Sequence, residues 1–123
     1  MEALADTILE RWFAPIFHQK HSLELNGYRN MLVRTHQEGY VATCAAIRDA
    51  DMTESTAKIG IPTLCICGEY DGSTPPELVR SMSELIAGSR FEIIEDAGHM
   101  PCIEQPKTLE TKIRHFLLEN DIV

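Results

Sequence analysis

The 123-residue sequence lacks a long apolar run and lacks a surplus of positive charge. The first absence leaves no transmembrane segment, because a membrane-spanning helix needs about 20 consecutive apolar residues. The second argues against nucleic acids and anionic membrane surfaces as partners. Eleven Lys and Arg stand against 19 Asp and Glu, for a formal net charge of −8. Small molecules remain as candidate ligands.

Secretory features and paired cysteines are also lacking. The first six residues carry acids where a secretory signal carries bases. Four cysteines show neither Cys-x-x-Cys spacing nor the density of a disulfide-stabilised domain, so we expect reduced thiols in a soluble, cytoplasmic protein. Cys65 and Cys67 lie two apart in an apolar run and share one face of a predicted strand. We interpret them as small hydrophobic residues rather than a metal pair, because further zinc ligands do not follow at characteristic spacing.

A predicted strand leads into an acidic turn and a helix start. Residues 63–67 form an apolar run of the length expected for a strand buried on both faces, and glycines mark the turn that contains Asp71. Thr74 is expected to cap the next helix, with Pro75 in its first position. In an open α/β sheet such a turn lies at the carboxyl end of the strand, where ligand sites form.

The remaining pattern predicts helices before this strand and a second strand after it. Helical spacing of apolar residues predicts helices within 3–13, 23–50 and 53–58, with Gly39 joining two helices of the middle range. A strand over 90–95 and a helix from Pro106 complete the chain, so its second part is a strand-helix-strand-helix unit with two parallel strands. Two strands are few for a complete α/β domain, and we expect part of a larger sheet.

Two turns carry residues that could take part in catalysis. Asp71 follows the first predicted strand and His99 follows the second, so adjacent parallel strands would bring them to one rim. A carboxylate there fixes the tautomer of the imidazole and leaves its other nitrogen free to take a proton from a nucleophile. The alternative is that Asp71 is a turn or capping residue and His99 a surface loop residue.

The residues around both turns resemble a known fold family. Gly68-Glu69-Tyr70-Asp71 with Thr74-Pro75-Pro76, and Gly98-His99 with Glu104-Gln105-Pro106, resemble the carboxy-terminal part of the α/β-hydrolase fold. Gly39-Tyr40 and the segment 48–51 resemble, within that fold, the 3-oxoadipate enol-lactonases. The resemblance implies an α/β protein with a partial α/β-hydrolase fold whose N-terminal half is absent. A helical cap-like segment, 1–52, would precede two parallel strands with flanking helices, 53–123.

The resemblance also implies a Ser-Asp-His triad in which Asp71 and His99 are the last two members, with no metal or organic cofactor. The serine of that triad stands in a Gly-x-Ser-x-Gly segment, and none of the six serines has this spacing. We therefore expect a chain that is inactive alone and acts on a small ester or lactone when an N-terminal half completes it. Trp12 and Met100 are predicted to contact substrate, with core packing as the alternative for each. Glu69 and Glu104, beside the two turns, are interpreted as capping or salt-bridge residues.

Two other hypotheses remain open. Within the hydrolase family, the chain could belong to another cap-bearing esterase or a haloperoxidase-like enzyme. Outside catalysis, it could be a binding or assembly module that self-associates through an exposed sheet edge, because an unpaired strand edge favours strand addition or swapping.

Overall fold

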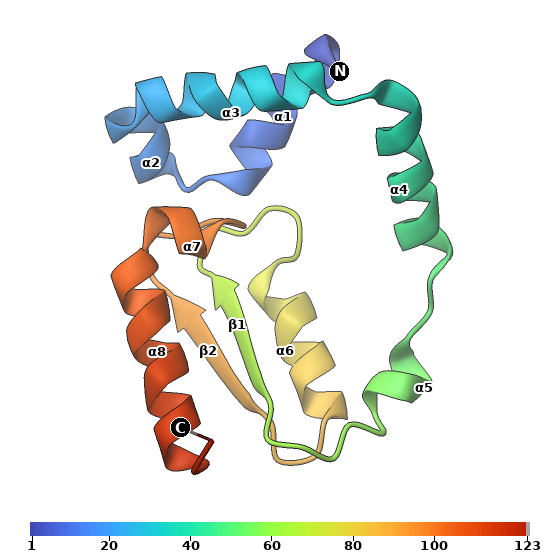
Figure 1. Ribbon diagram of the computed structural model, residues 1–123, viewed down its shortest axis with the longest axis vertical. Coiled ribbons are helices and arrows are strands. Elements are labelled where there is room, and N and C mark those ends of the chain that lie inside the picture. Colours follow the sequence, from blue (N-terminus) through green and yellow to red (C-terminus); the bar gives the residue numbers. More distant parts are fainter. Residues whose placement is uncertain (123) are drawn as a thin grey trace.

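The computed structural model describes residues 1–122, in which a layer of helices lies over a small α/β unit (Figure 1). The elements in chain order are α1 (Glu2–Trp12), α2 (Pro15–Lys20), α3 (Ser22–Arg34), α4 (Gln37–Asp49), α5 (Thr53–Thr56), β1 (Leu64–Gly68), α6 (Pro76–Leu85), β2 (Arg90–Ile94), α7 (Pro101–Glu104) and α8 (Pro106–Glu119). No helix within residues 1–122 has the length and apolar character needed to cross a membrane.

The helical layer has its own apolar core, formed by α1, α2 and α3. Ala5 and Leu9 lie four residues apart on α1, so they share a face, and both are buried. Phe13 stacks on Phe17, with ring centroids 4.8 Å apart, and on Tyr28 at 5.2 Å. Phe13 follows α1, Phe17 lies on α2 and Tyr28 on α3, so the stacked rings join the three helices. The loop between α1 and α2 lies on the side of the layer that faces the α/β unit (Figure 1).

Helix α4 is packed more loosely than the helices before it. None of its residues is buried, and Val41 and Ile47 are 58% and 71% exposed. In Figure 1 it runs along one side of the molecule and connects the helical layer to α5.

Strands β1 and β2 form a parallel pair whose register runs from Leu64 opposite Arg90 to Gly68 opposite Ile94. Cys65 and Cys67 are buried and share a face with Phe91, whose ring lies 4.4 Å below the Arg80 guanidinium of α6. On the opposite face, Glu92 bonds to Lys112 of α8 at 2.7 Å. Helices α6 and α8 therefore cover opposite faces of the sheet, and the prediction of two buried cysteines on one face is confirmed.

Several predicted boundaries are wrong. Thr74 does not cap α6: the N-cap is Pro75, no side chain caps this helix, and the helix begins one residue later than expected. The reason is that the Thr74 hydroxyl and N–H both donate to Asp71 instead. Gly39 does not join two helices but lies in the first turn of α4, because the chain breaks at Thr35 and His36, which have extended backbones. The short helix α7 was not expected.

Candidate active site

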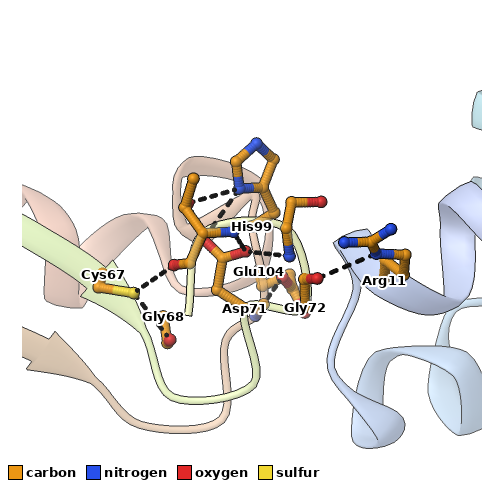
Figure 2. A network of polar contacts seen from close by, with 10 residues as sticks. Arg11, Cys67, Gly68, Asp71, Gly72, His99 and Glu104 are labelled. Carbon is orange, nitrogen blue, oxygen red and sulfur yellow. Dashed lines mark hydrogen bonds and ion pairs between the residues drawn. The ribbon is translucent and has the colours of Figure 1, made fainter. Parts of the chain in front are cut away.

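Asp71 and His99 meet where the two strands end. Because β1 and β2 are parallel and in register, the turns that follow them emerge at the same rim. Nδ1 of His99 lies 2.8 Å from Oδ2 of Asp71 (Figure 2). The ionised carboxylate can only accept, so Nδ1 carries the proton in this contact. In Figure 2 the other ring nitrogen points away from the cluster, and the side chain of His99 is 32% exposed, so Nε2 is accessible.

Asp71 is held firmly in its turn. Its side chain is only 5% exposed, and its Oδ1 accepts the N–H groups of Ser73 and Thr74, each at 2.8 Å. The Thr74 hydroxyl donates to Oδ2 at 2.7 Å. Burial by itself would raise the pKa of Asp71, but hydrogen bonds from His99, Thr74 and Ser73 outweigh it and lower the pKa below 3.8. Asp71 thus organises its turn and also bonds to His99, and its role in catalysis stays a prediction.

The two turns touch backbone to backbone, and glycines make this approach sterically feasible. A Cβ on Gly68 would collide with the carbonyl groups of Ala97 and Gly98, and a Cβ on Gly98 would collide with the carbonyl oxygen of Trp12. The N–H of Tyr70 donates to the oxygen of Ala97 at 2.8 Å across the same contact. Gly68 and Gly98 therefore set the distance between the Asp71 turn and the His99 turn.

The thiol of Cys67 lies below the Asp71 turn. It donates to the carbonyl oxygens of Gly68 and Thr74 at 3.2 and 3.3 Å. Burial raises the pKa of this thiol to about 11, and the negative charges of Asp71 and Glu77 add to the effect. Cys67 is therefore a protonated, structural thiol at neutral pH rather than a nucleophile.

Trp12 lies next to His99, with ring centroids 6.2 Å apart. It also lines a cavity of about 450 Å³ that opens beside the Asp71 turn, between α1 and α4. The residues around this cavity are Ile8, Arg11, Trp12, Tyr40, Cys44, Ile47, Arg48 and Ser73. Trp12 and Met100 both pack against the apolar core of the helical layer. Their contact with substrate stays a prediction, with Trp12 in the more suitable place.

Other residues of the site were missed or assigned differently from the sequence. Within residues 1–122 Glu104 forms no ion pair with a basic side chain, and its two carboxylate oxygens accept the N–H groups of Ala14 and Gly98 at 2.8 and 2.7 Å. Arg11 contacts the Asp71 turn through Gly72, with Nε donating to the Gly72 oxygen and the Arg11 oxygen accepting the Gly72 N–H, both at 3.0 Å. Within residues 1–122, no group of three or more His, Cys, Asp or Glu side chains is arranged to hold a metal ion.

This geometry agrees with the comparison with known families. A family model described as the alpha/beta hydrolase fold matches residues 13–106, which is most of the chain and includes both turns. The chain belongs to the α/β-hydrolase fold family. Within it, the partial α/β-hydrolase fold expected from the sequence is confirmed, because residues 1–122 contain only the two parallel strands β1 and β2.

Individual members of the α/β-hydrolase family resemble the chain over nearly its whole length. 3-Oxoadipate enol-lactonase 1 of Acinetobacter baylyi is 36% identical over 107 residues, covering 85% of this chain and 40% of the relative. 3-Oxoadipate enol-lactonase 2 of the same organism is 32% identical over 104 residues, covering 85% and 39%. The crystal structure of the enol-lactonase from Burkholderia xenovorans superimposes with a TM-score of 0.89 at 34% identity, covering 96% of this chain and 45% of that one. The chain thus spans less than half the length of these relatives.

Proposed function

We propose that this chain supplies the acid and the base of a serine-dependent ester or lactone hydrolase similar to the 3-oxoadipate enol-lactonases. The main observation in support is the 2.8 Å contact between Nδ1 of His99 and the buried, hydrogen-bonded carboxylate of Asp71, which leaves Nε2 accessible. The similarity to two enol-lactonases, and to a third as a solved structure, supports the substrate class.

In the proposed reaction, a serine hydroxyl attacks the carbonyl carbon of the ester or lactone while Nε2 of His99 takes its proton. The proton then passes to the leaving oxygen, and water, activated in the same way, releases the acid and regenerates the serine. Asp71 keeps the ring in the Nδ1–H tautomer and stabilises the imidazolium that forms. No metal or organic cofactor takes part in these steps.

The nucleophilic serine of the proposed reaction is not found in this sequence within its usual Gly-x-Ser-x-Gly segment. No Gly-x-Ser-x-Gly segment is present in the 123 residues, and Cys67 is protonated and buried. We therefore propose that the chain alone does not hydrolyse esters, and that the serine and the oxyanion-binding groups come from a segment corresponding to the remainder of the relatives. We also propose that the chain acts in a reducing compartment, the cytoplasm, because its cysteines are free thiols.

A chimera tests this proposal. This chain replaces the matching segment of 3-oxoadipate enol-lactonase 1 from Acinetobacter baylyi, and hydrolysis of the enol-lactone and of an activated ester is measured. We expect activity that falls roughly 10⁴-fold on His99→Ala, and no activity in the isolated chain. His115→Ala, an exposed histidine on α8, is the control and should leave the rate unchanged. A folded chimera without activity, or activity insensitive to His99→Ala, would contradict the proposal.

The open edge of β1 favours a second candidate function, an assembly module. In the ladder, Arg90 donates to Thr63 and Glu69 donates to Ile94, so the alternate residues Leu64 and Ile66 direct their backbone groups away from β2. Within residues 1–122, β2 is the sole strand paired with β1. We propose that this edge pairs with a second copy when no other strand covers it. Light scattering over a range of concentrations should then show a dimer or larger species, and a monodisperse monomer would refute self-association.

A further inference from the structure

The carboxylate of Glu104 joins the turn of His99 to the helical layer. Its Oε1 accepts the N–H of Gly98, the residue before His99, at 2.7 Å, and its Oε2 accepts the N–H of Ala14 at 2.8 Å. Glu104 is the last residue of α7, and Ala14 is the N-cap of α2. The bond to Ala14 spans 90 residues of sequence, and Figure 2 draws Glu104 below the imidazole.

Backbone contacts place the same junction against both catalytic turns. The His99 N–H donates to the oxygen of Trp12 at 2.7 Å, and Gly72, next to Asp71, exchanges hydrogen bonds with Arg11. Residues 11–14 therefore contact the Asp71 turn at one end and the His99 turn at the other. Glu104 secures the second of these contacts by bonding to the backbone on both sides of it.

The two N–H groups that Glu104 accepts are buried. Ala14 is fully buried and Gly98 is buried, so neither donor can turn to bulk water if the carboxylate is removed. Relief then requires the turn that carries His99 to move relative to Ala14, and the glycine at the start of that turn can change its backbone angles more readily than Ala14 can. Such a movement would change the direction of the imidazole relative to Asp71.

We propose that Glu104 is a positioning residue for His99: it holds the backbone on which the imidazole meets Asp71, without touching substrate. Calling the Asp71–His99 pair catalytic rests on the proposed function, whereas the positional claim rests on the contacts alone. The burial that raises the pKa of Glu104 agrees with an enclosed carboxyl group serving backbone donors rather than a surface ion pair.

The ring of His99 reports directly on its position. In the ¹⁵N-labelled chain, correlation spectra of the neutral His99 ring show which nitrogen carries the proton and how fast that proton exchanges. We expect the native chain to show a slowly exchanging Nδ1–H. In Glu104→Ala this proton should exchange at least tenfold faster, with ring shifts of mixed tautomers, and Glu104→Gln should give a smaller change of the same kind because its amide retains one acceptor.

Glu69→Gln is the matched control, since Glu69 also accepts a backbone N–H in this turn, that of Asp96 at 3.2 Å, from an exposed position. The His99 ring signals of Glu69→Gln should equal those of the native chain. A folded Glu104→Ala with unchanged tautomer and exchange rate overturns the proposal. If Glu104→Ala does not fold, Glu104→Gln decides, and unchanged ring signals in that variant overturn it equally.

The active chimera gives an independent readout. There, Glu104→Gln should lower kcat about tenfold or more and leave KM nearly unchanged, because small displacements of a catalytic group are costly. A rise of KM with an unchanged kcat would instead show that Glu104 acts in substrate binding, and it would overturn the proposal. If the chimera is inactive with native Glu104, the proposed function fails, while the ring spectra of the isolated chain still test the positional role.

Discussion

Replacing Asp71 by Asn keeps the shape of the side chain and removes its charge. An amide oxygen can continue to accept the N–H groups of Ser73 and Thr74 in the place of Oδ1. The NH₂ group then occupies the place of Oδ2, where it faces the Thr74 hydroxyl and Nδ1 of His99, and it can only donate. We therefore expect Nδ1 of His99 to become an acceptor and the ring proton to move to Nε2. That tautomer cannot take a proton from a nucleophile.

The energetic cost follows from the same four contacts. A hydrogen bond to a charged group contributes about 1 kcal/mol more than a neutral one, so four contacts lose about 4 kcal/mol of charge assistance. Removing a buried charge returns part of this, because the desolvation cost of the carboxylate disappears. We expect a net loss of about 2 kcal/mol in the free energy of unfolding at pH 7 for Asp71→Asn.

The pH dependence of this difference is a second check. The folded pKa of Asp71 lies below its ordinary value of 3.8, so the unfolded chain takes up the proton first as the pH falls. The contribution of Asp71 is therefore complete well above pH 3.8 and is lost as the pH falls through the folded pKa. Urea unfolding of both chains between pH 2.5 and 7, with ¹⁵N spectra of the His99 ring, measures both effects. An Asn variant that keeps the Nδ1–H tautomer and the native stability would refute the proposed geometry.

Three further outcomes follow from the structure. The pKa of Glu104 is raised above 4.5 by burial, against the hydrogen bonds from Ala14 and Gly98, so the folded state holds the proton more tightly. The free energy of unfolding of the native chain, relative to that of Glu104→Gln, should therefore decrease as the pH rises from 4.5 through the raised pKa. Urea unfolding at several pH values measures this difference, and an increase would contradict the expectation. Gly98→Ala should destabilise by about 2 kcal/mol through backbone collision, whereas Gly60→Ala, with open space around it, should be near neutral in thermal unfolding. A thiol reagent at pH 7.5 should modify exposed Cys44 rapidly and buried Cys67 only on unfolding, and equal rates would count against the buried thiol.

The local pattern of the sequence was sufficient for the α/β unit. The sequence predicted a parallel pair of strands, which the structure confirms. This prediction rested on the apolar run that ends before Gly68, on Pro75 and Pro106 as helix starts, and on the order strand-helix-strand-helix. The Asp71–His99 contact followed as well, because parallel strands in register end at the same rim and their turns must be neighbours. Sequence determined these features because they depend on residues close together in the chain and on the fixed geometry of a parallel ladder.

Which partners the polar side chains bind was decided only by the tertiary structure. The Thr74 hydroxyl donates to its neighbour Asp71 instead of capping α6, and Glu104 bonds to Ala14 at a separation of 90 residues. Arg11 reaches Gly72 across 61 residues. A short polar side chain can serve any nearby donor, and packing alone determines which backbone N–H groups are buried and need an acceptor. The sequence by itself therefore determined that Asp71 and His99 meet at one rim of the sheet, whereas the folded arrangement of helical layer and sheet determined what holds them in place.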